Sequence, residues 1–468
     1  MMWVTSLFAV VATVCAHSAQ EWKQSRIIYQ LLTDRFALPG GVTDASCSDL
    51  RNYCGGTFQG IIDRLDYIQE LGFNAIWISP VVKNSPGHYH GYAAIDFYTI
   101  SPEFGGEAGL KALVEACHQK GIWVMVDVVA NHMSDRFPIS QLIPFNETYH
   151  YHDCKGCPED CNINEFDGGY VNEHCRLSNL VDLDQDHPWV RSKLLEWISN
   201  LVKRYNVDGL RIDTIPMVKP QFWAEFQTAA GVYAVGEVFS GDVNLVSRYQ
   251  KGGLNALLNY PLYQEVISVF ADQTSMWALH NLFSTYKVFS DSSILGTFFD
   301  NHDNPRFLSK RYDVNSLKNA LTFSLLAEGI PIMYYGTEQL FHGGDDPGCR
   351  EPLWYSKYDN STDMFKFVQT LVGFWKSHSI GTHPMSEKWV KDHIYVYSRG
   401  SNVIVATTNS FSVTETVQYL DLPEGRVLCN LFNPHDCVTV HQSSLTVSIQ
   451  DGLPKVYYYD NQNLSLKE

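Results

Sequence analysis

The sequence GLRIDTIP, residues 209–216, places two charged side chains inside an apolar segment. Side chains alternate between the two faces of a β-strand, so Arg211 and Asp213 point to one face while Leu210 and Ile212 point to the other. A carboxylate in a buried strand is costly unless a partner or a function offsets its desolvation. The segment therefore predicts a buried strand that ends in a functional pair of charges.

The same arrangement recurs twice further along the chain. Glu237 ends the apolar run in GVYAVGEVF, and His302 and Asp303 follow an apolar run in GTFFDNHDNPRF. Carboxylates at the carboxyl ends of neighbouring buried strands meet at one edge of a parallel sheet. We therefore expect Asp213, Glu237 and Asp303 to share one site.

Short apolar runs alternate with amphipathic segments over most of the chain. Helical spacing marks segments such as QGIIDRLDYIQELG and HPWVRSKLLEWISNLVKRYN. Eight runs are predicted to be buried strands: RIIYQLLTDRF, FNAIWISPV, IWVMVDVVANH, VDGLRIDT, VYAVGEVF, LNALLNY, ILGTFFDNHD and IPIMYYGTE. Strands regularly separated by helices pair in parallel, so the predicted fold class is α/β, a (β/α)8 TIM barrel.

Two regions depart from this alternation and define the predicted domains. Residues 133–182, after the third strand, are Cys-rich and lack helical periodicity, which indicates a small inserted subdomain. From residue 385 to residue 468 the pattern changes to alternating strands without helices, which predicts a C-terminal antiparallel β-sandwich domain. The barrel is expected to occupy residues 20–384.

The N-terminus resembles a secretory signal peptide. The first 20 residues carry no acidic or basic side chain, and an apolar run extends from Leu7 to Ala16. That run is too short to span a bilayer, and small residues offer cleavage after Ala16 or Ala19. We expect residues 1–19 to be removed and the mature protein to be soluble and secreted, because no later segment reaches spanning length.

The composition excludes some classes of partner. The formal charge is −17, and no basic patch is evident, which argues against nucleic acid and anionic membranes as partners. Ten of the eleven cysteines lie after the predicted signal, as an oxidising compartment permits. Sequons at Asn146, Asn360 and Asn463 allow glycosylation on the same route.

The cysteine spacing favours local disulfides. Cys47 with Cys54, and Cys429 with Cys437, each bracket a short loop. Residues 154–175 hold four cysteines near three histidines, for which zinc is the alternative, but an exported chain favours disulfides. Cys117 is expected to be a buried thiol, and Cys349 has no evident partner. The spacing leaves the connectivity of the four clustered cysteines open.

Several ordered blocks resemble the α-amylase family of glycoside hydrolases, most closely its secreted fungal-type members. The blocks are DVVANH at 127–132, GLRIDT at 209–214, GEV at 236–238 and NHDNPRF at 301–307. The likeness extends to GGTFQGIIDRLDYIQELGFNAIWISPV, YHGY and IPIMYYGTEQ. The resemblance implies endo-hydrolysis of α-1,4-glucosidic bonds in starch-type or glycogen-type glucans, with retention of anomeric configuration.

The resemblance also implies roles for individual residues. Asp213 would be the nucleophile, Glu237 the acid and base, and Asp303 the stabiliser of a distorted sugar, which together suit a retaining mechanism. The implied substrate-binding residues are Tyr92, His132, Arg211, His302, Asp346 and Arg350. Without these ordered blocks, His132, His302 and Tyr92 would be interpreted as structural, whereas Arg211 and Asp303 could equally be a structural ion pair or part of a site. We expect Asp127 to be a buried structural support.

Calcium is the cofactor that the resemblance implies, because a hard cation binds several oxygen ligands. The implied ligands are Asn131, Glu173, Asp182 and the backbone carbonyl of Met217. The expected partner is an α-glucan, and the expected oligomeric state is a monomer.

Two departures from the family pattern affect specificity. Pro216 and Met217 stand where family members commonly carry Lys-His, and Ala93 stands where a Trp often follows YHGY. The first pair lies where the leaving sugar is accepted, so the product pattern is expected to differ. Two alternatives stay open: an exo-acting α-glucosidase or transglycosylase on the same scaffold, and a noncatalytic glycan-binding protein derived from an amylase.

Overall fold

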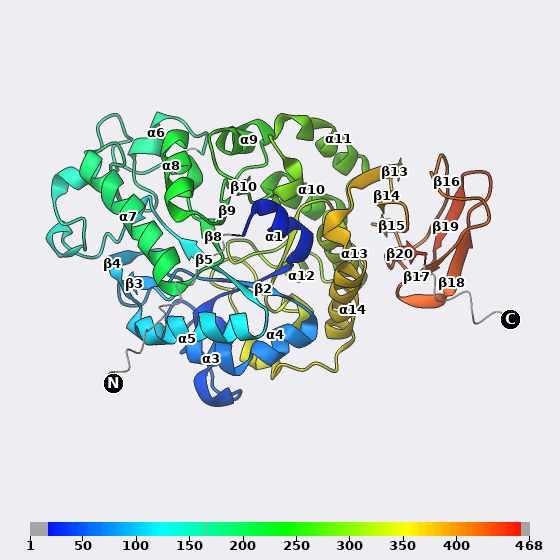
Figure 1. Ribbon diagram of the computed structural model, residues 1–468, viewed down its shortest axis with the longest axis horizontal. Helices are drawn as coiled ribbons and strands as arrows, with labels where there is room; N and C mark the ends of the chain where they lie inside the picture. Colours follow the sequence, from blue (N-terminus) through cyan, green and yellow to red (C-terminus); the bar gives the residue numbers. More distant parts are fainter. Residues whose placement is uncertain (1–16, 165, 460–468) are drawn as a thin grey trace, which may run out of the picture.

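The structure is a computed structural model that describes residues 17–164 and 166–459 (Figure 1). Most of the predicted signal peptide, residues 1–16, lies outside these residues. Helix α1 (Ala19–Ser25) is the first element among the described residues. Ser18 caps this helix reciprocally with Glu21, and Trp22 is fully buried against the barrel.

A closed parallel barrel forms the centre of the described chain. Its sheet runs in the order β10-β9-β8-β5-β2-β1-β12-β11, and a parallel bridge between Leu258 and Gly296 joins the two ends. Within the described residues, the strands are β1 (Ile28–Leu31), β2 (Ala75–Ile78), β5 (Trp123–Val128), β8 (Gly209–Ile212), β9 (Tyr233–Gly236), β10 (Ala256–Leu257), β11 (Gly296–Thr297) and β12 (Ile330–Tyr334). Each coincides with one of the eight predicted runs, so the predicted α/β barrel is confirmed.

The strands are continuous apolar runs because both of their faces are buried. In β2 and β8 all four residues are buried, as helices cover the outside of the barrel and side chains fill its interior. Figure 1 shows the helices around the strands. The longer ones among the described residues are α5 (Gly106–Gln119), α7 (Pro188–Tyr205), α8 (Pro220–Ala230), α9 (Val243–Lys251), α10 (Tyr260–Phe270), α11 (Trp277–Thr285), α13 (Val314–Leu326) and α14 (Asp363–Ser377).

Two local features differ from the sequence-based expectation. The helix predicted over QGIIDRLDYIQELG is divided into α3 (Phe58–Asp63) and α4 (Leu65–Leu71), because Arg64 leaves the helical region with φ −122° and ψ 13°. A hairpin that the sequence did not reveal, β3 (Val82–Asn84) with β4 (Ala94–Ile100), follows β2. Register shifts in this hairpin break the regular alternation that would have signalled it.

The segment after β5 is a loop-rich excursion closed at its base. β6 (His132–Met133) pairs antiparallel with β7 (Val181–Asp182), so that His132 lies opposite Asp182. Between them lie the short helix α6 (Tyr170–His174) and two disulfides, Cys154–Cys161 and Cys157–Cys175. Disulfides, not zinc, therefore account for these cysteines. In the part of the chain that the structure describes, no cluster of His, Cys, Asp and Glu could hold a metal by those residue types alone.

The remaining predicted cysteine pairs are also present. Cys47–Cys54 and Cys429–Cys437 are disulfides. Among the described residues, Cys117 and Cys349 are free and buried.

The C-terminal region consists of two antiparallel sheets that share one apolar core. The larger sheet contains β13 (Met385–Lys391), β14 (Ile394–Arg399), β15 (Val403–Thr408), β20 (Lys455–Tyr458), β17 (Val427–Asn430) and β18 (Asn433–Thr439) in that order. The smaller sheet pairs β16 (Val413–Val417) with β19 (Leu445–Ile449). Ile404 and Val447 belong to the same buried cluster, which matches the expected sandwich. Figure 1 shows these sheets as a lobe beside α13 and α14.

A buried amide connects this lobe to the barrel. Asn319 of α13 is fully buried, accepts the backbone N–H of Thr408 at 2.8 Å and donates to the carbonyl of Gly452 at 2.8 Å. Thr408 ends β15 and Gly452 lies between β19 and β20, so one side chain satisfies two separate backbone groups of the C-terminal lobe.

We expect Asn319→Leu to destabilise the protein by about 2 kcal/mol or more, because it leaves a buried N–H and a buried carbonyl without partners. Thermal unfolding measures the effect. The matched control is Asn315→Ala, one turn earlier, whose amide donates to Asp451 at an exposed position. An equal loss of melting temperature in both variants would contradict the proposed importance of the buried contact.

Candidate active site

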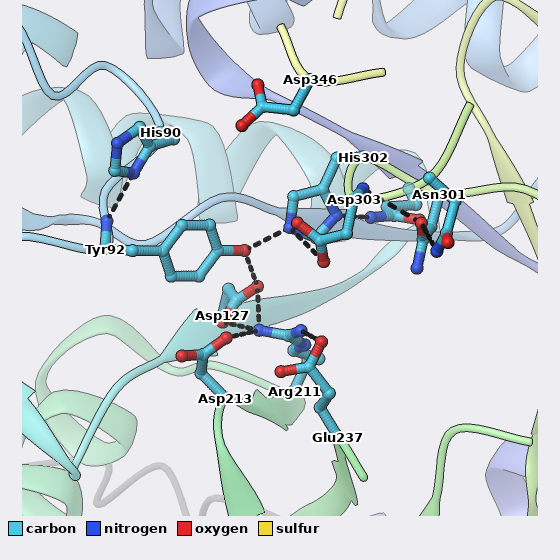
Figure 2. Close-up of polar contacts among 12 residues, drawn as sticks. His90, Tyr92, Asp127, Arg211, Asp213, Glu237, Asn301, His302, Asp303 and Asp346 are labelled. Carbon is cyan, nitrogen blue, oxygen red and sulfur yellow. Dashed lines mark hydrogen bonds and ion pairs between the residues drawn. The ribbon is translucent and has the colours of Figure 1, made fainter. Parts of the chain in front are cut away.

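The predicted site residues meet at one end of the barrel. Asp127 lies in β5, Arg211 in β8, Glu237 directly after β9, and Asp303 after β11. These are the carboxyl ends of the strands, where the side chains of a (β/α)8 barrel converge. Figure 2 shows the cluster, with Asp213 and Glu237 on either side of the Arg211 guanidinium.

Arg211 is the centre of the cluster. Its Nη1 donates to Asp213 Oδ1 at 2.6 Å and to both oxygens of Asp127 at 3.0 and 3.1 Å, and its Nη2 lies 2.7 Å from Glu237 Oε1. The arginine is fully buried. One guanidinium therefore separates the expected nucleophile from the expected acid, and Asp127 is part of the same ion network.

Burial sets the ionisation of this network. Burial raises the pKa of Glu237 to about 8; Arg211 opposes this shift, and the charges of Asp213 and Asp303 add to it. Burial also raises the pKa of Asp213 to about 6, against the opposing charge of Arg211. Desolvation favours the neutral form of both Asp213 and Glu237. Asp213 has the lower pKa of the two, so it ionises first. At neutral pH the pair therefore holds one carboxylate and one carboxylic acid.

The backbone after the strand also contributes to the site. Thr214 has φ +52°, a left-handed conformation that is rare for a β-branched residue. In this conformation its N–H donates to Glu237 Oε2 at 3.2 Å. Non-glycine residues in this region cluster at functional sites, where the surrounding structure holds them in place.

Tyr92 lies between two histidines, and its hydroxyl points toward His302 (Figure 2). Its ring lies between His90, at a centroid distance of 5.5 Å, and His302, at 5.6 Å. Its hydroxyl lies 2.8 Å from Asp127 Oδ2 and 2.6 Å from His302 Nε2. Burial lowers the pKa of His302 to about 3, so the imidazole is neutral and its Nδ1 accepts from the Gln30 amide.

Asp303 and Asp346 meet at a second arginine. Arg350 Nη2 donates to Asp303 Oδ1 at 3.3 Å, and Arg350 Nη1 lies 3.0 Å from Asp346 Oδ1. Burial acts to raise the pKa of Asp303, but His302, Arg350 and Arg211 outweigh it and hold this pKa below the usual value. Asp303 therefore stays ionised to a lower pH than Asp213 or Glu237.

Two cavities open on the cluster. One, of about 410 Å³, is lined by Tyr92, His132, Asp213, Glu237 and Asp303 at its inner end. The other, of about 480 Å³, is lined by Tyr89, His90, Asp346 and Arg350. Eight of the nine expected catalytic and substrate-binding residues thus lie within the ion network or along these two cavities, and His302 lies beside them, with Nε2 2.6 Å from the Tyr92 hydroxyl. The placement leaves the assigned roles as predictions.

Three oxygen atoms converge beside the cleft, near the base of the insertion. His132 Nε2 lies 3.0 Å from the carbonyl of Tyr92, which can only accept, so in the neutral ring Nδ1 carries the lone pair. The Asn131 amide nitrogen must then face Nδ1, at 3.1 Å. This orientation turns the Asn131 oxygen toward Asp182 Oδ1 at 3.1 Å and the Met217 carbonyl at 3.2 Å.

With the Asn131 amide in this orientation, the three oxygens face one another without a hydrogen-bond donor between them. Such a set of oxygens fits a hard cation. Only one of the three oxygens belongs to a carboxylate, because the other two come from an amide and a backbone carbonyl. Glu173, the fourth expected ligand, lines a small neighbouring cavity with His152, and His152 Nδ1 lies 2.6 Å from Asp182 Oδ2.

Some site residues escaped the sequence analysis. Gln30 and Tyr260 carry no motif; Gln30 lies near the end of β1, and Tyr260 begins α10 three residues after β10. Tyr260 lies 3.5 Å from Glu237 Oε1 and accepts a hydrogen bond from Asn301. His90 could have been found from its place in YHGY, next to Tyr92. The rule that polar residues near the ends of barrel strands face the barrel mouth would have included Gln30.

Comparisons with known proteins agree with this geometry. The family described as "Alpha amylase, catalytic domain" matches residues 30–409. The chain is 37% identical to the α-amylase of Saccharomycopsis fibuligera, covering 94% of this chain and 92% of that protein. It is 36% identical to α-amylase 2 of Schwanniomyces occidentalis, covering 94% and 91%. The solved α-amylase of Malbranchea cinnamomea superposes with a TM-score of 0.89, at 36% identity, covering 95% and 98%.

The fold and the site define a glycoside hydrolase built on a (β/α)8 barrel. The chain belongs to the α-amylase family.

The pKa order predicts a bell-shaped pH profile for glucan hydrolysis. If Asp213 is the nucleophile and Glu237 the acid, as expected, kcat/KM should rise as Asp213 loses its proton near pH 6 and fall as Glu237 loses its proton near pH 8. Initial rates on a soluble maltooligosaccharide, measured from pH 4 to pH 10, test this order. A profile with no fall on the alkaline side would contradict the role of Glu237 as the acid.

Proposed function

We propose that this enzyme hydrolyses internal α-1,4-glucosidic bonds of starch-type and glycogen-type glucans with retention of configuration. The observation that supports the proposal is the pair Asp213 and Glu237, held by the two terminal nitrogens of one buried guanidinium. Retaining glycosidases need two carboxyl groups about 5 Å apart, one ionised and one protonated. Here one Arg contacts both carboxyl groups, and the pKa of Asp213 lies below that of Glu237, so one group can be ionised while the other is protonated.

The first chemical step follows from the protonation states. Asp213 attacks the anomeric carbon and forms an ester with the glycosyl unit, while Glu237 gives its proton to the leaving glycosidic oxygen. In the second step Glu237, now ionised, takes a proton from water, and the water oxygen replaces the Asp213 oxygen at the anomeric carbon. Arg211 keeps Asp213 ionised and stabilises the negative charge as it shifts between the two carboxyl groups.

The residues opposite Arg211 would hold the sugar that reacts. Asp303 and His132 carry hydrogen-bonding groups along the cavity, which Tyr92 also lines, and His302 lies 2.6 Å from the Tyr92 hydroxyl. Asp346 and Arg350 extend this polar surface into the second cavity. Because Asp303 stays ionised, it would favour the positive charge that develops on the sugar in the transition state.

Calcium is the cation that we propose for Asn131, Asp182 and Met217, with Glu173 nearby. Bound there, a cation would tie the base of the insertion to the segment that follows Asp213. Its contribution would be structural, because the cleft residues themselves carry the reacting groups.

Export is part of the proposal. The expected cleavage after Ala16 would retain Ser18, the cap of α1, whereas cleavage after Ala19 would remove it. Disulfides at four pairs suit an oxidising compartment. Asn146 and Asn360 are exposed sequon sites, and Asn463 lies outside the described residues. Among the helices of the described residues, none is long and apolar enough to cross a membrane.

The alternatives differ in products. A noncatalytic glycan-binding protein would not need an Asp, a Glu and an Arg in one ion network. An exo-acting α-glucosidase would release glucose from chain ends, whereas the open cavities on both sides of the carboxylates suit an internal bond. A maltooligosaccharide blocked at its non-reducing end separates the two: the proposed enzyme cleaves it and releases α-anomers. Release of β-anomers, or no cleavage of the blocked chain, would refute endo-acting retention.

Replacing the proposed nucleophile or acid should abolish most activity. We expect Asp213→Asn and Glu237→Gln each to lower kcat on soluble starch by about 10³-fold or more, because each removes a group that forms or breaks the glycosidic bond. Binding of an uncleaved glucan to the folded variants serves as the control. A Asp213→Asn enzyme that retains the wild-type rate would exclude this residue as nucleophile.

Removal of the cation should lower thermal stability. We expect excess chelator to reduce the melting temperature of the wild-type protein by several degrees, because three buried oxygens lose their partner. Asn131→Leu should melt at a lower temperature and respond less to the chelator. An identical chelator effect in both proteins would place the cation elsewhere.

A further inference from the structure

An aromatic cluster lies on the surface at the beginning of α7, and none of its rings lines either of the two cavities beside the carboxylates. His150 and Trp189 stack at a centroid distance of 4.4 Å with an interplanar angle of 10°. Tyr149 packs edge-on against His150 at 4.7 Å. His150 is buried, but Trp189 is 38% exposed and Tyr149 is 60% exposed. Two large rings that contact one buried histidine are therefore open to solvent.

The surrounding structure holds these rings in place. η4 (Thr148–His150) is a single 3-10 turn, and the N–H of Glu147 donates to His150 Nδ1 at 3.2 Å. Trp189 lies in the first turn of α7, where the buried ring of Phe145 packs against it at 6.0 Å. Large apolar side chains are usually covered. Two fixed and exposed rings therefore indicate a surface that another group covers.

A glycosylation sequon runs through the same turn. It consists of Asn146, Glu147 and Thr148, with Phe145 directly before it and Tyr149 directly after it. Asn146 is exposed, and among the described residues its side-chain amide has no hydrogen-bond partner. A glycan on this nitrogen would therefore displace no hydrogen bond of the folded chain.

The sequon at Asn360 differs in this respect. Its side-chain nitrogen donates to both oxygens of Glu70, at 2.9 and 3.1 Å. A nitrogen that is bonded to a sugar keeps only one N–H, so a glycan at Asn360 would cost contacts that a glycan at Asn146 does not. The third sequon, at Asn463, lies outside the described residues. Of the two described sequons, the folded chain suits a glycan better at Asn146.

We propose that Asn146 carries an N-linked glycan whose first sugars pack on Tyr149 and Trp189. The inference rests on the export in the proposed function, because such glycans are added to secreted proteins. N-acetylglucosamine presents C–H groups and a methyl group, which pack on aromatic rings. The glycan covers the two exposed rings and keeps this apolar surface from associating with other proteins.

The attachment balances with a lipid-linked oligosaccharide diphosphate as the donor. The bond between the anomeric carbon of the donor sugar and its diphosphate oxygen breaks, and the diphosphate leaves with the electron pair. A bond forms from that carbon to Nδ2 of Asn146, which loses one proton. Nothing is oxidised or reduced, and this chain supplies only the acceptor amide.

Occupancy of the sequon is measured on the full chain secreted by a yeast host. Digestion with peptide N-glycosidase in heavy-oxygen water converts a glycosylated asparagine to a labelled aspartate, which peptide mass spectrometry assigns to one position. We expect the label at Asn146 in most molecules. Thr148→Ala should lose it, because this variant removes the sequon while it keeps the asparagine.

Packing of the glycan on the rings is measured by thermal unfolding before and after glycan removal under native conditions. We expect removal to lower the melting temperature of the wild-type protein by about 2 °C. Tyr149→Ser and Trp189→Ser should show at most about half of this effect, because the sugars have less to contact. Comparing each variant with and without its glycan cancels the direct effect of the substitution.

The matched control is Tyr419→Ser. It removes an 87% exposed tyrosine of the C-terminal lobe, at the far end of the molecule from α7 (Figure 1). This variant should keep the full effect of glycan removal, because the glycan at Asn146 does not reach that lobe.

The outcomes separate the inference from the proposed function. An unlabelled Asn146 in the secreted protein, or an undiminished effect of glycan removal in both ring variants, would overturn the inference while leaving glucan hydrolysis intact. An unlabelled Asn146 together with weaker binding of starch granules by Trp189→Ser would assign the cluster to a free glucan instead. A chain that the host does not export would overturn the proposed export itself.

Discussion

The site depends on one buried guanidinium that is shared by three carboxyl groups. Arg211 contacts Asp127, Asp213 and Glu237 within 3.1 Å, and it is fully shielded from water. Three carboxylates around a single positive charge would leave two uncompensated negative charges in a low-dielectric interior. One of them must therefore keep its proton, and the environment assigns that proton to Glu237. The same constraint places a carboxylic acid next to a carboxylate, which are the states that the proposed acid and nucleophile need.

The barrel makes this arrangement possible because it brings distant parts of the chain to one rim. β5, β8 and β9 are neighbours in the sheet, and Asp127 pairs in register with Arg211. The Asp127–Arg211 contact therefore follows from strand pairing alone. Glu237 reaches the same guanidinium from the next strand along, with the left-handed Thr214 fixing its second oxygen.

Much of this could be predicted from the sequence. The strands were recognisable because they are buried on both faces and carry short apolar runs, and the charges in GLRIDT and GEV stood out against them. Asp127 was expected to be only a structural support, although its ion pair with Arg211 joins the catalytic network. The sharing of one Arg among three acids could not be foreseen, because periodicity gives the face of a residue and not its distance to another strand.

Other parts were hidden for different physical reasons. The β3–β4 hairpin has an irregular register, so its alternation is broken. Tyr260 begins helix α10, where a residue is expected to serve the helix and not the cleft. The substitution of Pro216 and Met217 for charged residues was visible in the sequence, but its partners Phe166 and Phe239 come from separate loops. Only the structure shows that all four of these residues line the same cavity.

The ladder that closes the insertion has a consequence for how this enzyme can vary. His132 and Asp182 lie opposite each other at the base, and the chain between them is braced by its own disulfides. Because both ends of the excursion are held by this ladder, loops between them that contact neither the cation position nor the disulfides can change in length while His132 stays at the cleft.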